Sequence, residues 1–329
     1  MNIHYFFRKK QSHFHSIENL FTNLQYYLPN SCHFVNINLP CHNGILGRIK
    51  NIFFAKKTKA QINHITGDVN YIAIGLPRQN TILTIHDVFS ALKGNFIKKN
   101  IIKFFWFTIP LKKVKYITTI SQTTKNQVIK VFKVDKNKIF VIPNCFDQKF
   151  LNPTKDFNKQ CPRILFVGTK WNKNLERTIV SLYNIKCVLI IIGKLTTEQI
   201  NLLNKYKIKY ENYFEVDQDQ LIEIYKNSDM LLFPSTNEGF GMPIIEAQAA
   251  SVPVITSNIE PMKQVAGNGA LLVDPYDAIS IKNAVEKIIN DDVLRKKIVE
   301  QGSENVKNYH PSAISEKYYQ LYKKILDEQ

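Results

Sequence analysis

Short apolar runs alternate with longer segments of helical spacing along the first half of the chain. The runs predict strands at Ile3–Phe7, Phe34–Ile37, Gln61–Ile65, Thr81–Ile85, Tyr116–Ile120 and Lys138–Ile142. Helices are expected at Ile17–Tyr27, Ile45–Lys57, Ile97–Ile109 and Gln122–Phe132. Strands that alternate with helices indicate a parallel sheet that is covered on both faces.

The same alternation restarts after a polar, irregular stretch from Phe150 to Cys161. It predicts strands at Arg163–Val167, Cys187–Ile192, Tyr210–Phe214, Met230–Phe233 and Val254–Thr256, and helices at Leu175–Leu182, Thr197–Lys205, Gln220–Asn227 and Pro243–Ala250. Apolar residues recur at near-helical spacing from Pro311 to Glu328, which indicates a closing helix. The pattern therefore predicts an α/β domain at 1–150, a linker at 151–162, a second α/β domain at 163–310 and a C-terminal helix at 311–329.

The positive charge of the chain is confined to the first of these domains. The 329 residues carry a formal net charge of +17. Residues 1–150 hold 22 basic and 5 acidic side chains, whereas residues 151–329 hold 22 of each. An excess in one domain implies an anionic partner, such as phospholipid, nucleic acid or a phosphorylated substrate. The hydrophobic content of 44% excludes a disordered chain.

Cysteine usage and the N-terminus both favour the cytoplasm. The five cysteines are scattered and never spaced as CxxC, which argues against a disulfide framework or a structural zinc site. The start MNIHYFFRKK places apolar residues before charges, the reverse of a secretory signal. No run approaches the roughly 18 apolar residues that a membrane span needs.

The glycines point to a candidate binding edge. Only 12 occur, and Gly168 and Gly193 directly follow apolar strands, where open α/β sheets bind ligands. In MLLFPSTNEGFGMP, Gly239 and Gly241 allow a tight loop before a helix that Pro243 can begin, so the amides of Gly241 and Met242 form an anion site. Glu246 is expected in the first turn of this helix, where an acid could also serve only the helix dipole.

The string NEGFGMPIIEAQA followed by VPVI, in which seven residues separate Glu238 from Glu246, resembles the signature of retaining GT-B glycosyltransferases of family 4. FVGTKWNKNLERTI at 166–179 resembles the donor-phosphate loop of that family, and VIPNCFD at 141–147 and TILTIHD at 81–87 resemble segments of its N-terminal domain. The resemblance implies an α/β GT-B fold, with two Rossmann-like domains facing across a cleft and a C-terminal closing helix.

The resemblance also implies a nucleotide-sugar donor that is held on the C-terminal domain. Glu246 would accept hydrogen bonds from ribose hydroxyls, Glu238 would hold sugar hydroxyls, and Lys173 would neutralise charge on the leaving diphosphate. The implied donor-binding residues are Gly168, Lys170, Lys173, Asn174, Glu238, Gly239, Phe240, Gly241, Met242 and Glu246, and the implied catalytic residues are His86, Lys173 and Glu238.

Several of these residues have a plainer alternative. Without the resemblance, Lys173 is a solvated loop lysine, and His86 is a core or turn histidine instead of a group that faces the reacting sugar. Lys170 stands where relatives place an arginine, and it offers a point charge without a bidentate fork. The resemblance implies retention of the anomeric configuration, and because no nucleophile stands out in this sequence, we expect a front-face reaction.

The sequence Asp217-Gln218-Asp219 is a literal DxD, the metal–diphosphate motif of another glycosyltransferase fold. It immediately precedes a helical segment, so we interpret the two acids as helix-capping residues. Charge on the leaving diphosphate would then be met by lysine and helix amides. We therefore expect no metal ion and no other cofactor.

Two segments of the basic half could meet an anionic membrane surface. Ile45–Lys59 and Phe96–Leu111 both mix bulky apolar side chains with lysines, which suits an anionic lipid interface. Each could equally be a core-facing helix with solvated lysines. No motif for nucleic-acid binding is recognisable, so nucleic acid is a less favoured partner.

The resemblance therefore implies a glycosyltransferase, of the hexosyltransferase class, that moves a sugar from a nucleotide-sugar to a glycan or lipid-linked acceptor. We expect it to act in cell-surface polysaccharide or lipopolysaccharide biosynthesis, in the cytoplasm or peripherally at the inner face of the cytoplasmic membrane. The alternative is a noncatalytic protein that retains the GT-B fold and binds nucleic acid or membrane.

Overall fold

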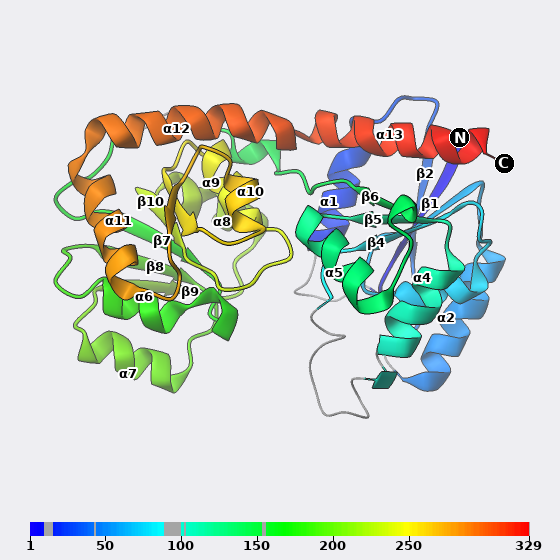
Figure 1. The fold of residues 1–329 in the computed structure, drawn as a ribbon, viewed down its shortest axis with the longest axis horizontal. Coiled ribbons are helices and arrows are strands. Elements are labelled where there is room, and N and C mark those ends of the chain that lie inside the picture. The colour runs from blue at the N-terminus through cyan, green and yellow to red at the C-terminus, as the bar shows by residue number, and fades with distance from the viewer. Residues whose placement is uncertain (10–15, 43, 89–99, 102, 153–155, 329) are drawn as a thin grey trace. The chain divides into compact units, whose positions relative to one another are not determined.

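The computed structural model describes residues 1–9, 16–42, 44–88, 100–101, 103–152 and 156–328 (Figure 1). The chain divides into two compact units, one formed by Met1–Asn144 with Pro311–Gln329 and the other by Cys145–His310. The break after Asn144 lies six residues before the domain boundary expected at 150. The C-terminal segment 311–329, expected as a separate element, groups with the first unit.

The first unit is built on a parallel sheet. Its described strands follow the order β2-β1-β3-β4-β5-β6. The strands are β1 (Asn2–Phe7), β2 (His33–Asn38), β3 (Ile62–Ile65), β4 (Thr81–Ile85), β5 (Tyr116–Thr119) and β6 (Ile139–Val141). The helical elements are α1 (Ser16–Gln25), α2 (Ile45–Lys57), η1 (Asn70–Gly75), η3 (Lys103–Thr108), α4 (Ile109–Lys113), α5 (Gln122–Phe132), η4 (Lys136–Lys138) and α13 (Pro311–Asp327).

The second unit holds another parallel sheet, in the order β12-β11-β10-β7-β8-β9. The strands are β7 (Arg163–Val167), β8 (Val188–Ile192), β9 (Tyr210–Tyr213), β10 (Met230–Phe233), β11 (Val254–Ser257) and β12 (Leu271–Val273). The helical elements are η5 (Gln148–Phe150), η6 (Trp171–Lys173), α6 (Leu175–Ser181), α7 (Thr197–Lys205), α8 (Gln218–Lys226), α9 (Met242–Ala249), α10 (Met262–Ala266), α11 (Ala278–Asn290), α12 (Asp292–Val306) and η7 (Lys307–Tyr309). This is the strand order of the Rossmann fold, with its switch point between β7 and β10.

The strands predicted from apolar runs are confirmed, because each corresponds to an observed strand within two residues at either end. The helix expected at Ile97–Ile109 differs: its described residues 103–108 are π-helical, and α4 then continues to Lys113. Residues 97–99 and 102 of that helix lie outside the described part of the chain. Sequence reasoning offered no elements between 257 and 310, where α10, β12, α11 and α12 lie.

The C-terminal helix α13 closes the first unit through a buried polar network. In Figure 1 it runs beside α1, and the Ser315 hydroxyl donates to the Leu24 carbonyl. The Tyr322 hydroxyl lies 2.8 Å from His64 Nδ1 and 3.0 Å from the Tyr5 hydroxyl. Burial lowers the pKa of His64 to about 3, so its ring is neutral and its second nitrogen bonds to Thr84.

Replacing Tyr322 with phenylalanine should therefore lower the free energy of unfolding by about 1–3 kcal/mol, because buried polar partners lose their hydrogen bond. Urea denaturation measures the change. The matched control is Tyr319→Phe, since Tyr319 lies on the same helix and is only half-buried. Equal losses for the two variants would contradict the role of the network.

Among the described residues, no helix is both long enough and apolar enough to cross a membrane. The five cysteines are all free thiols.

Candidate functional site

The switch point of the second sheet brings together the two loops that carry most of the predicted site residues. One loop follows β7 and contains Gly168, Lys170 and Lys173; the other follows β10 and leads into α9. At a switch point the flanking loops leave the sheet in opposite directions and open a crevice at the carboxyl ends of the strands. The parallel register of β7 and β10 places both loops at that edge.

A short ion pair joins the two loops. Lys173 Nζ lies 2.8 Å from Glu238 Oε1, and the side chains are 18% and 14% exposed. The same ammonium lies 4.7 Å from the centre of the Phe233 ring, which holds it over the end of β10. The pair leaves both charged groups partly open to a ligand while fixing their separation.

Gly168 is the residue that lets Lys173 reach this position. Its φ of +91° lies in the left-handed region, and a Cβ there would lie 2.9 Å from Lys173 Cε. A side chain at Gly168 would therefore displace the lysine from Glu238. Gly168 therefore positions Lys173 through its backbone conformation and its lack of a side chain. A contact between Gly168 and a donor stays a prediction.

Backbone and amide contacts hold the two loops in register. The Asn172 amide donates to the Asn237 carbonyl at 2.8 Å, and the Thr236 N–H donates to the Asn172 carbonyl at 2.8 Å. Asn174, at φ 70°, is buried and donates to the carbonyls of Pro234 and Pro275. Its side chain is thus engaged within the protein, where it shapes the loop on which Lys173 lies.

The N-terminus of α9 faces the same edge. Gly241 precedes the helix at φ +113°, a conformation that favours glycine, and Met242 is the first helical residue. Pro243 lacks the N–H that would be unpaired in this turn, and amides at the start of a helix can meet a negative charge. Phe240 is buried, and its ring packs edge-on against Tyr309. It therefore anchors the loop from the inside.

Glu246 lies beyond the first turn of α9, so its expected position in that turn is wrong. The helix begins at Met242, one residue earlier than predicted, because Gly241, the residue before it, has a left-handed backbone conformation. The alternative of a purely dipolar role in the first turn therefore loses its basis. The carboxylate instead accepts a hydrogen bond of 2.6 Å from the Tyr225 hydroxyl on α8.

The environment of Glu246 raises its pKa to about 7, mainly because the carboxyl group is buried. The Tyr225 hydrogen bond and the charge of Lys173 oppose the rise, and the charge of Asp147 adds to it. Such a carboxyl group is sensitive to any ligand that donates hydrogen bonds to it.

Sequence reasoning missed Tyr225. Its ring is fully buried and lies edge-on to Phe150 at 5.1 Å, so its hydroxyl is held toward Glu246. The available signal was its position on the buried face of a predicted helix that leads directly into β10.

Of the remaining predicted residues, Lys170 is exposed at the start of η6, and Gly239 lies in the loop beside Glu238.

In the first unit, His86 follows β4 at the carboxyl edge of the sheet. Its Nε2 lies 2.7 Å from the Thr66 carbonyl, and a carbonyl only accepts, so Nε2 carries the proton. The ring rests against Gly67, where a Cβ would lie 2.6 Å from His86 Cδ2. The structure thus fixes the orientation of the ring that the sequence left open, and its function stays a prediction.

A cluster of charged residues at the switch point of the first sheet, between β1 and β3, was also missed. Arg8 follows β1 and Asp68 follows β3; Arg8 Nη1 donates to Asp68 at 2.7 Å, and Arg8 Nε donates to Glu18 at 3.1 Å. Because β1, β3 and β4 are neighbours in a parallel sheet, this cluster and His86 share one edge. The signal in the sequence was a charged residue within three positions of the end of each of two predicted strands.

Asp217 of the DxD sequence caps α8, as predicted, whereas Asp219, also predicted as a capping residue, lies within the first turn of that helix. The Asp217 carboxylate accepts from the Gln220 N–H at 2.8 Å, and the Gln220 side chain accepts from the Asp217 N–H at 3.1 Å. Asp219 points to solvent and pairs with Lys149. The described residues include no group of three or more His, Cys, Asp or Glu side chains that could hold a metal ion.

Asp217→Ala is therefore expected to lower the free energy of unfolding by about 1 kcal/mol through loss of the N-cap. Asp219→Ala should leave stability unchanged, because its ion pair is exposed. Thermal or chemical denaturation of both variants, with transferase assays at controlled Mn²⁺, provides the test. Equal effects of both variants on a Mn²⁺-dependent rate would favour a metal role instead.

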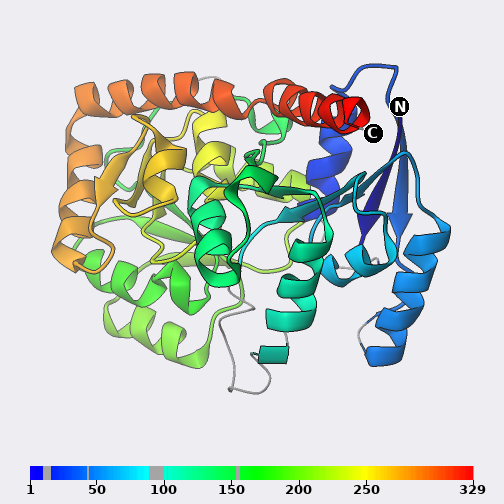
Figure 2. The same cartoon turned by 45° about the vertical axis from the view of Figure 1, so that its right-hand side comes forward.

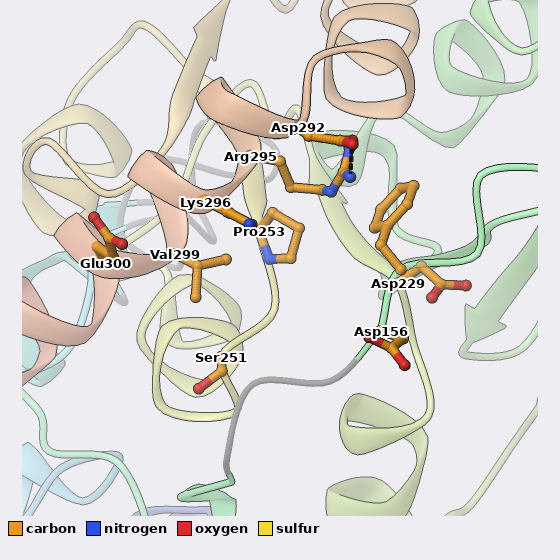
Figure 3. A pocket seen from close by; sticks show the side chains of 10 residues that line it. Asp156, Asp229, Ser251, Pro253, Asp292, Arg295, Lys296, Val299 and Glu300 are labelled. Atoms are coloured by element: carbon orange, nitrogen blue, oxygen red, sulfur yellow. Dashed lines mark hydrogen bonds and ion pairs between the residues drawn. The ribbon is translucent and has the colours of Figure 1, made fainter.

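A cavity of about 580 Å³ lies at the opposite edge of the second sheet (Figure 3). Its lining includes Asp229 before β10 and Arg295 on α12. Asp229 accepts from the N–H groups of Asn158 and Arg163, and Arg295 donates to the Ile288 carbonyl, so these charged groups are engaged within the protein. The cavity lies away from the sheet edge that holds Lys173 and Glu238, and neither residue lines it.

Family models match both halves of the chain. Residues 147–305 match the model described as glycosyl transferases group 1, and residues 29–150 match the model described as glycosyltransferase family 4.

Two similar proteins have names that refer to the O-antigen chain and to capsular polysaccharide biosynthesis. The O-antigen chain mannosyltransferase RfbU of Salmonella typhimurium is 31% identical over 222 residues, which cover 64% of this chain and 61% of that protein. The capsular polysaccharide biosynthesis glycosyltransferase CapM of Staphylococcus aureus is 36% identical over 152 residues, which cover 44% of this chain and 40% of that protein. The matched region spans less than two thirds of the length of either relative.

The fold is shown by solved structures. The HepE protein of Anabaena, in complex with UDP and glucose, matches 98% of this chain and 100% of its own with a TM-score of 0.78 at 12% identity. Together with the two parallel Rossmann-like sheets, this shows the GT-B fold. The fold and the two matched domains support a transferase enzyme of the glycosyltransferase class.

Proposed function

We propose that the protein transfers a sugar, with retention of the anomeric configuration, from a nucleotide-sugar to a glycan or lipid-linked acceptor during cell-surface polysaccharide or lipopolysaccharide biosynthesis. The observation that carries the proposal is the Lys173–Glu238 pair at the switch point of the second sheet, beside the N-terminus of α9. Cation, carboxylate and free amides at one edge suit a diphosphate that is linked to a sugar. The names of RfbU and CapM support the proposed pathway class.

On the donor side, each group has a distinct task. Lys173, helped by exposed Lys170, neutralises the charge that grows on the leaving diphosphate, and the amides at Gly241 and Met242 bind its oxygens. Glu238 accepts hydrogen bonds from sugar hydroxyls, and Glu246 accepts them from the ribose. The protein groups meet the diphosphate charge themselves, so we propose that no metal ion or other cofactor takes part.

The proposed reaction is a front-face displacement. The bond between the anomeric carbon and the leaving phosphate oxygen breaks, that oxygen takes the proton of the acceptor hydroxyl, and the acceptor oxygen bonds to the same face of the sugar. Glu238 suits an orienting role better than that of a nucleophile, because its Oε1 is already bonded to Lys173 at 2.8 Å. The enzyme thus acts mainly by orientation and electrostatic stabilisation.

The first unit is proposed to receive the acceptor at the edge that holds His86 and Arg8. His86 Nε2–H is engaged by the Thr66 carbonyl, so the other ring nitrogen is the one that could accept a hydrogen bond from an acceptor hydroxyl. A lipid-linked acceptor would place the protein in the cytoplasm, peripherally at the inner face of the cytoplasmic membrane.

Thermal stabilisation across a panel of UDP-, GDP-, ADP- and dTDP-sugars tests the proposal and identifies the nucleotide. One donor should raise the melting temperature, and NMR of the product should show the donor's anomeric configuration. An inverted product would overturn retention. The absence of any shift, together with salt-sensitive binding of DNA or RNA, would favour a noncatalytic nucleic-acid-binding protein.

A further inference from the structure

Helix α2 turns an apolar face outward. Ile45, Leu46, Ile49 and Phe53 are 74%, 76%, 44% and 58% exposed. Residues three and four positions apart share one face of a helix, so these side chains form a continuous strip along α2. Large apolar groups that are gathered on a surface in this way mark an interaction site.

The opposite face of α2 fixes this orientation. Ala55 and Asn51 are fully buried, and the Asn51 amide donates to the Tyr71 hydroxyl at 2.8 Å and to the Cys41 carbonyl at 3.1 Å. Rotation of the helix would bury the apolar strip only by breaking these buried hydrogen bonds. Helix α2 thus packs one side on the core, as the alternative of a core-facing helix expects, and in addition keeps an apolar strip exposed on its other side.

The element η3, which contacts α2, adds two exposed aromatic side chains. Phe104 and Phe105 are 51% and 49% exposed. The Arg48 guanidinium of α2 lies 4.0 Å from the centre of the Trp106 ring of η3, so the two elements are in contact. In Figures 1 and 2, α2 (blue) and the 103–113 segment (teal) extend from the same side of the sheet. We call the side chains of Ile45, Leu46, Ile49, Phe53, Phe104 and Phe105 the docking face.

Charge around the docking face identifies its occupant. The sequence contains no acidic residue at 45–60 or at 100–115. Exposed lysines lie at positions 50, 56 and 57 of α2 and at positions 112 and 113 of α4, which follows η3. Two copies of such a face would repel each other, and a nucleic acid would leave the apolar strip in water. An anionic bilayer satisfies both parts of the surface, because acyl chains accept the apolar groups and head groups accept the lysines.

We propose that the docking face inserts into the interface of an anionic bilayer and holds the first unit at the membrane. The inference deepens the proposed function, on which it rests for the identity of a lipid-linked acceptor. It assigns the membrane contact to α2 and η3. The sheet edge that carries His86 is then left for the acceptor head group.

Flotation of the full chain with vesicles tests the docking face. The native chain should float with phosphatidylcholine vesicles that contain phosphatidylglycerol, and much less with phosphatidylcholine alone. Leu46→Ser with Phe53→Ser should weaken partitioning roughly tenfold or more, and Lys56→Gln with Lys57→Gln should weaken it roughly fivefold per lysine. The matched control is Ile279→Ser with Val293→Ser, which removes exposed apolar groups from the second unit and should change nothing.

Unchanged flotation of the Leu46/Phe53 variant, or equal binding to both vesicle types, would overturn the proposal. So would a native dimer in solution that the Leu46/Phe53 variant abolishes, or binding of DNA without binding of vesicles. Donor binding is measured in parallel on the same preparations. Flotation without donor binding contradicts the proposed function alone, whereas donor binding without flotation contradicts the docking face alone.

Discussion

Replacing Lys173 with methionine is expected to lower kcat about 10²–10³-fold, with a smaller change in KM. The ammonium lies at the switch-point edge beside Glu238 and the N-terminus of α9, where the leaving diphosphate is proposed to bind. Removal of one preorganised electrostatic group from a transition state costs about that factor. The effect falls on kcat because charge on the diphosphate increases as the glycosidic bond lengthens. Steady-state kinetics with the donor identified by the panel measures both constants.

The same substitution leaves Glu238 without its cation, so stability is the necessary control. Glu238 is only 14% exposed at its side chain, and loss of a charge-assisted hydrogen bond costs about 1.5–3 kcal/mol. Lys173→Met with Glu238→Gln should recover part of that stability while kcat stays low. A double variant that regains activity along with stability would show that Lys173 acts only as a structural partner of Glu238.

Glu246→Gln is expected to separate donor binding from stability. Loss of the carboxylate should weaken donor binding about 10–100-fold, because hydrogen bonds to a charged group contribute about 1.5–3 kcal/mol each. Donor affinity of the native chain should rise as the pH passes through about 7, where the carboxyl group ionises. Calorimetric titration with a nucleotide-sugar between pH 5.5 and 8.5 should show this rise for the native chain and none for the variant.

Donor affinity should rise with pH, whereas the free energy of unfolding should fall. The pKa of Glu246 is raised from 4.5 to about 7, so between these pH values the folded chain binds more protons than the unfolded chain. The free energy of unfolding therefore falls as the pH rises through this window, by up to roughly 3 kcal/mol, and stays low above it. Glu246→Gln should lack this fall and be more stable than the native chain at pH 8. A variant that is less stable there, with unchanged donor affinity, would contradict the assigned role.

Tyr225→Phe tests how Glu246 is positioned. The Tyr225 hydrogen bond lowers the pKa of Glu246, so its loss should move the rise in donor affinity to higher pH. Tyr213→Phe is the matched control, since Tyr213 donates a similar bond of 2.8 Å to Glu211 on β9. Identical pH profiles for the Tyr225 variant and the native chain would exclude a positioning role.

Sequence patterns predicted those helices and strands whose formation depends mainly on their own residues. β7, β10 and α2 have the predicted bounds, because apolar runs and helical spacing are properties of short segments. No element was predicted from 257 to 310, although the buried residues Ile281, Val285 and Ile288 of α11 lie there at helical spacing. The outward face of α2 depends on hydrogen bonds from Asn51 to Cys41 and Tyr71, which the segment alone does not contain.

For the candidate site, individual residues were predicted from the sequence, but the contacts between them were not. The sequence predicted Lys173, Glu238 and Glu246 as individual residues through their motifs. It did not predict the contact between Lys173 and Glu238, which joins residues 65 apart, or that of Tyr225 with Glu246. These contacts depend on strand order, which places the loops after β7 and β10 at one switch point. The position of Glu246 was wrong by less than a turn because helix starts depend on single backbone conformations.

A crystal structure of the full chain with the nucleotide-sugar selected by the panel tests the central claim most directly. The account predicts the diphosphate against Lys173 and the amides of Gly241 and Met242, with ribose hydroxyls at Glu246 and sugar hydroxyls at Glu238. A nucleotide-sugar bound away from this edge, for example in the cavity between Asp229 and Arg295, would contradict it.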